Sequence, residues 1–180
     1  MLFDYLLLSG CLLPNRYSYS ENGVKIELQP QSGELILLFH IDDQSNRDCK
    51  FRRVLELDNQ GMKMCDLIVF YAKDSTRNIC FIELKGRDIE TAIQQINNTY
   101  KYFHAKLNQS NACNLVPEVN TKACIVSRAC VPIKPLDSYT SYKELKYNFG
   151  KENISISKSS SLDRFLRGLN YEPKGKKNRK

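Results

Sequence analysis

The sequence predicts an α/β (or α+β) fold in which helices flank a mixed central β-sheet, and three observations support this class. Two consecutive apolar runs, 64–70 and 79–85, have the length and composition of buried strands. Residues 88–107 then change to a helical apolar period, and residues 122–128 return to a strand-like run. Because a strand–helix–strand passage requires a crossover connection, part of the sheet should be parallel.

Residues 1–13 predict a short amphipathic helix that ends near Pro14 and closes against the core. Within it, Leu8-Ser9-Gly10-Cys11 resembles the cleavage site of a lipoprotein. However, no positive charge precedes it, Asp4 interrupts the apolar stretch, and that stretch is very short. No segment approaches the roughly 20 apolar residues of a membrane span, so we expect a cytoplasmic protein without a membrane partner.

Three strands are expected between this helix and the two apolar runs. Residues 24–28 alternate between apolar and polar side chains, as in a strand with one wet face. Residues 34–41 form a second, more apolar strand, and residues 51–57 a third. The dipeptide Asn22-Gly23 supplies a strong turn signal before the first of them.

The helix expected over residues 88–107 has a single apolar stripe with Asp88 as its N-cap. The stripe recurs every three or four residues and consists of Ile89, Ile93, Ile96, Tyr100, Phe103 and Leu107. Beyond the strand at 122–128, residues 139–156 are ambiguous between helix and strand. A final short amphipathic helix should begin at Ser161.

Length and charge predict one domain followed by a basic tail. The chain has 180 residues, and we assign residues 1–170 to a single domain. The formal net charge is +7, of which residues 171–180, with five basic groups and one acid, supply +4. Such a tail suits contact with nucleic-acid phosphates, or it is a solvated, disordered end.

Cysteine and histidine usage does not predict a structural zinc site. The seven cysteines contain no Cys-x-x-Cys pair, and the two histidines, His40 and His104, lie far apart in the sequence. A reducing cytoplasm is the simplest setting for such a chain.

Three charged residues, Asp66, Glu83 and Lys85, lie at the ends of the two central apolar runs. Burying a charged side chain costs several kcal/mol unless the charge is paired or holds a metal. Alternation along a strand places Glu83 and Lys85 on one face, and Asp66 meets Glu83 if the register allows it. Two carboxylates suit Mg²⁺, with Mn²⁺ as a substitute. The alternative is a structural ion pair at the sheet end.

The Glu-x-Lys spacing alone carries little information, because the chain contains it three times. A second Glu-Leu-Lys lies at residues 144–146 in a polar, Tyr- and Lys-rich stretch, and Glu-Pro-Lys lies at residues 172–174 in the tail. Only the copy at residues 83–85 combines a strand context, an upstream acid and a following helix.

This combination resembles the PD-(D/E)XK nuclease superfamily, whose restriction-endonuclease-like core is a helix, three strands, a helix and a strand (αβββαβ). The resemblance covers about residues 50–128 and is carried by Asp66 and by Glu83-Leu84-Lys85. Cys65 stands where the superfamily name has its proline. The resemblance implies a metal-dependent nuclease.

The resemblance also implies a role for each matching residue. The implied metal ligands are Asp66, Glu83 and the carbonyl of Leu84, while Lys85 would assist the attacking water. A glutamine on the following helix often lies near such a site, and we favour Gln95 over Gln94. A further acid is frequent in the superfamily, and Glu56 is a candidate if the strand at 51–57 has the right register. Some viral RNA endonucleases of this fold use an upstream histidine, for which His40 is the candidate.

The expected function is Mg²⁺-dependent hydrolysis of phosphodiester bonds in DNA. Two alternatives stay open: an RNA endonuclease, and a catalytically silent module on the same fold that binds nucleic acid or a protein. The expected partner is nucleic acid, DNA ahead of RNA, and a homodimer is compatible with the fold class. Tyrosines 139, 142 and 147, interleaved with lysines, either stack on bases or form an ordinary surface.

Overall fold

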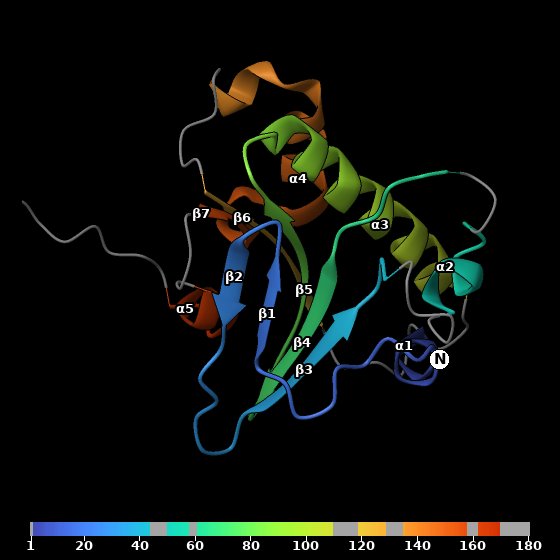
Figure 1. Cartoon of the computed structure of the whole chain (residues 1–180), viewed down its shortest axis with the longest axis vertical. Coiled ribbons are helices and arrows are strands. Elements are labelled where there is room, and N and C mark those ends of the chain that lie inside the picture. Colours follow the sequence, from blue (N-terminus) through green and yellow to red (C-terminus); the bar gives the residue numbers. More distant parts are fainter. Residues whose placement is uncertain are drawn as a thin grey trace, which may run out of the picture.

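The structure, a computed structural model, describes residues 2–43, 50–57, 61–109, 119–128, 135–157 and 162–169. Within these residues the main feature is a five-stranded sheet of order β3-β4-β5-β6-β7 (Figure 1). Its strands are β3 (Leu35–His40), β4 (Leu67–Lys73), β5 (Thr76–Lys85), β6 (Asn120–Ser127) and β7 (Ile154–Ser157). The first three pair antiparallel, whereas β5–β6 and β6–β7 pair parallel, so the predicted mixed sheet flanked by helices is confirmed.

Each face of this sheet has its own hydrophobic core. One core packs the sheet against four helices, α1 (Leu2–Leu8), α2 (Phe51–Val54), α3 (Ile89–Gln109) and α4 (Thr140–Phe149). The other core packs it against α5 (Leu162–Leu166) and the antiparallel pair β1 (Ser18–Glu21) and β2 (Val24–Glu27). Figure 1 shows the β1–β2 hairpin in front of the sheet, with α3 running along it on the other side. Two short 3₁₀ helices, η1 (Leu136–Ser138) and η2 (Lys151–Asn153), flank α4.

Side chains along β5 alternate between the two faces of the sheet, one covered by α3 and the other by the β1–β2 hairpin. Phe81 lies in the core with α3, whereas Ile82 and Leu84 lie in the core with the hairpin. The Phe81 ring is fully buried and meets the rings of Phe103 and Phe149 edge-on, at centroid distances of 5.4 and 5.8 Å. By the same alternation, Glu83 and Lys85 both belong to the α3 side, so they share one face as predicted.

Helix α3 is the crossover that makes β5 and β6 parallel. Its first turn is capped as predicted, because Oδ1 of Asp88 accepts a hydrogen bond from the backbone N–H of Thr91 at 3.0 Å. The predicted stripe is buried at Ile89, Ile93, Ile96 and Phe103, and partly buried at Tyr100. The side chain of Leu107 lies outside the described part of the chain.

The β1–β2 hairpin is fixed over the sheet by its inner face and by its turn. Val24 and Ile26 are buried in the second core. Asn22 and Gly23 both have positive φ, 51° and 67°, as a two-residue type I′ turn requires. The guanidinium of Arg128 donates a hydrogen bond to the Gly23 carbonyl at 3.0 Å, and a Cβ on Gly23 would lie 1.4 Å from that guanidinium. A side chain at this position would displace the guanidinium, and the positive φ also favours glycine.

The prediction of a strand over residues 51–57 is wrong, because this segment begins with helix α2. Phe51 and Leu55, four residues apart, are both buried, which helical spacing achieves without burying Arg53. Arg52 reaches away from the core to a carboxylate oxygen of Asp42 at 2.7 Å. The third antiparallel strand of the sheet is therefore β3, which comes earlier in the chain.

Other boundaries also differ from the predictions. The first helix ends at Leu8, not near residue 13, because Gly10 has a positive φ of 73° and Leu12 forms a bridge to the edge strand β3. The ambiguous stretch 139–156 resolves into α4 and β7. The final helix is present as α5, although Ser161 and the basic tail, 171–180, lie outside the described residues. In the described ranges, no helix is both long and apolar enough to cross a membrane.

Candidate active site

The structure brings Asp66 and Glu83 into direct contact at the end of the sheet. Leu67 on β4 pairs with Ile82 on β5, so Asp66 and Glu83 occupy the next position of this antiparallel pair. The backbone N–H of Asp66 donates to Oε2 of Glu83 at 3.2 Å, and Oδ2 of Asp66 accepts from the N–H of Leu84 at 2.7 Å. Both acids are buried, with exposed fractions of 8% for Asp66 and 1% for Glu83.

Lys85 completes this group and is held from two sides. Its ammonium donates to Oε1 of Glu83 at 3.1 Å and to Oε1 of Gln95 at 2.7 Å. Gln95, on helix α3, also donates its Nε2 to the carbonyl of Met64 at 2.7 Å. The predicted choice between the two glutamines agrees with the geometry, since Gln95 is buried beside Lys85 whereas Gln94 is exposed.

Burial disfavours the charged form of both acids. Desolvation raises the pKa of Asp66 to about 7, and the neighbouring charges of Glu21 and Asp42 add to this rise. Desolvation and the charge of Asp66 raise the pKa of Glu83 to about 8, while the ammonium of Lys85 opposes that rise. At neutral pH the metal-free pair therefore retains protons, and a bound cation would have to displace them.

The donor set fits a hard divalent cation that keeps several waters. Oδ1 of Asp66 accepts no hydrogen bond from any described residue, whereas Oδ2 accepts the one from Leu84. The Leu84 N–H points at Asp66. In an extended strand the N–H and the carbonyl of one residue point the same way, so the Leu84 carbonyl also points toward the side of Asp66. Two carboxylates and one carbonyl are oxygen donors of the kind that Mg²⁺ takes. No cluster of three or more His, Cys, Asp or Glu side chains with metal-binding geometry occurs among the described residues.

A second group of polar residues lies next to Asp66. It includes His40, the candidate upstream histidine, whereas its other members were not predicted from the sequence. The Tyr19 hydroxyl is 2.8 Å from Oε2 of Glu21 and 2.8 Å from Nε2 of His40, and Nδ1 of His40 is 3.3 Å from Oδ2 of Asp43. Burial and the carboxylates of Glu21 and Asp66 raise the pKa of Tyr19. The turn Asn22-Gly23 was the signal that could have revealed this group, because a hairpin turn requires a strand before it.

Glu56, the candidate third acid, and His104 both make contacts outside this group of residues. Glu56 is exposed, has a positive φ of 60° and forms an ion pair with Lys106, so its prediction as a third acid is wrong. His104 is exposed on α3 and stacks on Tyr100 at a centroid distance of 5.4 Å.

The second Glu-Leu-Lys copy lies in helix α4 and lacks the geometry of the first. Only its central Leu145 is buried. Lys146 pairs with Asp137 at 2.5 Å, and Glu144 accepts a long hydrogen bond of 3.5 Å from Asn97. The tripeptide therefore has no acid pair here, as its sequence context predicted.

Comparisons of the chain with protein-family models, with curated proteins and with solved structures find no match. The function must therefore be inferred from the site itself.

Proposed function

We propose that this protein is a metal-dependent nuclease that hydrolyses phosphodiester bonds of DNA. The observation that carries the proposal is the convergence of Asp66, Glu83 and Lys85 at one end of the sheet, with Gln95 behind the lysine. The element order supports the resemblance to PD-(D/E)XK nucleases, because three antiparallel strands, β3, β4 and β5, precede helix α3 and the parallel strand β6.

In this proposal, Asp66, Glu83 and the Leu84 carbonyl hold the metal ion. A bound Mg²⁺ would lower the pKa of a coordinated water and neutralise charge on the phosphate. Lys85 lies 3.1 Å from Glu83, where its ammonium can orient the attacking water or stabilise negative charge on a non-bridging oxygen. Gln95 fixes the direction of that ammonium, because its amide is itself held by the Met64 carbonyl.

A second candidate function is a catalytically silent nucleic-acid-binding module on the same fold. One observation favours it: both carboxylate oxygens of Glu83 already have partners within the protein, the Asp66 N–H and the Lys85 ammonium. A buried pair satisfied in this way can be purely structural. Such a module would bind nucleic acid without metal-dependent turnover.

Cleavage assays with matched variants test the proposal. Supercoiled plasmid and end-labelled DNA and RNA oligonucleotides would be incubated with Mg²⁺, with Mn²⁺ and with EDTA. We expect Glu83→Ala and Lys85→Ala to reduce the rate by at least about 100-fold, as loss of a metal ligand or a charge-stabilising group does. Gln95→Leu should give a smaller loss, because the ammonium remains but is no longer oriented.

The chain supplies its own control for these variants. Glu144→Ala and Lys146→Ala make the same changes in the same tripeptide, in helix α4 and without an acid pair, and should leave cleavage unchanged. Equal activity of Glu83→Ala, Lys85→Ala and wild type would reject the proposed site. If purified wild type cleaves neither DNA nor RNA but still binds them, the silent module becomes the better account. Faster cleavage of RNA than of DNA would reassign the substrate.

A further inference from the structure

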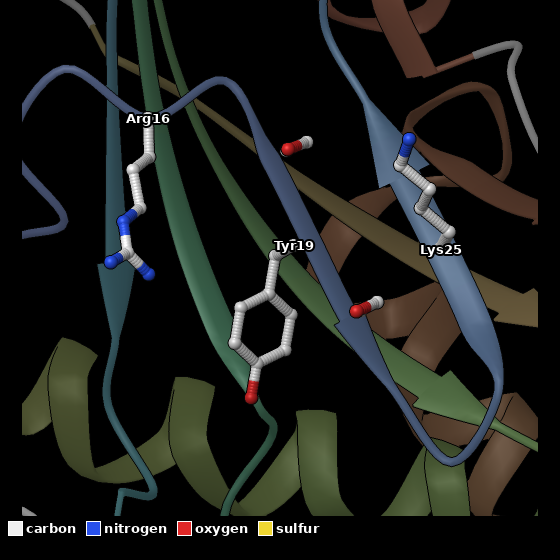
Figure 2. A pocket seen from close by; sticks show the side chains of 5 residues that line it. Arg16, Tyr19 and Lys25 are labelled. Atoms are coloured by element: carbon white, nitrogen blue, oxygen red, sulfur yellow. The ribbon is translucent and has the colours of Figure 1, made fainter.

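A surface pocket of about 460 Å³ lies on the β1–β2 hairpin, outside the acid pair. It is lined by Arg16, Ser18, Tyr19, Ser20 and Lys25. Figure 2 shows Arg16 and Tyr19 extending along the same side of β1, with Lys25 rising from the neighbouring strand β2. The lining thus combines two cations with three hydroxyl groups and contains no acid.

Most of these donors are uncommitted within the described part of the chain. The Arg16 guanidinium and the hydroxyls of Ser18 and Ser20 have no hydrogen-bond partner there, and all three residues are exposed. Lys25 pairs with Glu27 at 2.8 Å, but both side chains are about 60% exposed. Exposed pairs of this kind contribute little to stability, so a stronger anion can displace the carboxylate.

The chemistry of the lining matches a phosphate group. A guanidinium binds two phosphate oxygens at once, a lysine supplies a point charge, and serine hydroxyls donate to the remaining oxygens. Arginine, lysine and serine are also the side chains that most often contact the backbone of nucleic acids. A carboxylate ligand would use only part of this donor set.

Tyr19 connects the pocket to the candidate active site. Its ring lines the pocket, while its hydroxyl lies 2.8 Å from His40 and 2.8 Å from Glu21. The charges of Glu21 and Asp66 both act on this hydroxyl, so one member of the acid pair lies near the inner end of a side chain that lines the pocket. A polynucleotide held at Asp66 and Glu83 would therefore pass near the pocket.

We infer that this pocket binds a backbone phosphate of the nucleic acid, away from the phosphodiester that is cleaved. The inference rests on the proposed function in one respect, because the ligand is the same polynucleotide. Arg16 and Lys25 supply positive charge from the two sides of strand β1, and the hydroxyls of Ser18 and Ser20 donate to the phosphate oxygens. The pocket positions the strand and reads no base sequence.

Binding measured in EDTA tests the inference without any cleavage. Fluorescence anisotropy of labelled single-stranded and duplex DNA would be recorded over a series of salt concentrations. We expect the double variant Arg16→Gln/Lys25→Gln to bind about tenfold more weakly than wild type at fixed salt, as loss of a charged hydrogen bond implies. The slope of log K against log salt should fall by about one, corresponding to one phosphate contact.

A matched variant controls for the loss of two positive charges. Lys101→Gln/Lys151→Gln removes two exposed lysines from α3 and η2, away from the pocket, and should leave both affinity and slope unchanged. All changes are at exposed side chains, and thermal melts would verify folding. Equal affinity and slope for the pocket variant and wild type would overturn the inference, as would equal losses in both double variants.

Two further measurements separate the sources of the phosphate. At constant ionic strength, inorganic phosphate and a mononucleotide would be titrated and followed by NMR at the Arg16 side chain. Weak or undetectable binding of both, with strong binding of DNA, supports the backbone assignment. Tight binding of a mononucleotide without binding of DNA, or binding to phosphatidylserine vesicles instead of DNA, would overturn it.

The inference and the proposed function can fail independently. If wild type does not cleave DNA, and Arg16→Gln/Lys25→Gln binds DNA more weakly than wild type, the phosphate-binding pocket is supported and the nuclease function is rejected. If cleavage depends on Glu83 and Lys85, but the pocket variant binds DNA as tightly as wild type, the nuclease function is supported and the phosphate-binding pocket is rejected.

Discussion

Replacing Glu83 by glutamine should stabilise the metal-free protein at high pH, and the size of the effect follows from the burial of this acid. Burial and the charge of Asp66 raise the pKa of Glu83 from 4.5 to about 8. The folded protein therefore keeps a proton on Glu83 up to about pH 8, whereas the unfolded chain releases it near pH 4.5. Each pH unit in this window lowers the free energy of unfolding by about 1.4 kcal/mol.

The effect of Glu83→Gln is best measured as the change in the free energy of unfolding between two pH values. From pH 5 to pH 8, wild type should lose about 3.5 kcal/mol through this group, and Glu83→Gln should lose none of it. Urea unfolding in EDTA at both pH values would give the free energies of unfolding. Asp66 titrates in both proteins, so the difference between them reports on Glu83.

A matched control and a refuting result are both available. Glu90→Gln makes the same substitution at an exposed position in the first turn of α3, and should change stability equally at pH 5 and pH 8. If wild type and Glu83→Gln lose stability in parallel between the two pH values, Glu83 does not retain a proton in the folded state. The raised pKa, and the requirement that a metal displace protons, would then both be wrong.

Two further predictions concern the metal and the core. Mg²⁺ affinity measured by calorimetry should fall by up to about tenfold per pH unit between pH 8 and pH 7, and by up to about 100-fold per unit below pH 7, where both carboxyls hold protons. Asp66→Asn should abolish this binding, and a pH-independent affinity would contradict the proton competition. Phe81→Ala should lower the free energy of unfolding by about 3–5 kcal/mol, because the ring is fully buried against Phe103 and Phe149. A loss below about 1 kcal/mol in urea unfolding would show that this aromatic contact does not hold the sheet to α3.

The sequence predicted the central sheet well because its signals are local. The runs containing Asp66 and Glu83 are continuous apolar segments, and helix α3 has an uninterrupted stripe with a capping aspartate at residue 88. Alternation alone was sufficient to place Glu83 and Lys85 on one face. Helical spacing also distinguishes Gln95 from Gln94, because Gln95 lies on the row of the buried residues Ala92 and Thr99, whereas Gln94 is exposed.

The incorrect and missing parts depend on contacts between distant segments. Residues 51–57 are short enough to satisfy a strand period and a helical turn equally, and only the packing of Phe51 and Leu55 decides between them. Strand β1 is polar and has four residues, so composition gives no signal for it. The contact between Tyr19 and His40 joins residues 21 positions apart and exists only because the hairpin lies across the sheet.

The β1–β2 hairpin buries one set of side chains and exposes another, and this difference affects which residues can change during evolution. Its inward residues, Val24 and Ile26, are committed to the core, and Gly23 is committed to Arg128. The exposed residues Arg16, which precedes β1, and Lys25, on β2, belong to neither core. Substituting only these exposed residues would change the affinity for a ligand without altering the candidate active site or the core. We therefore expect related chains to differ most at these exposed positions.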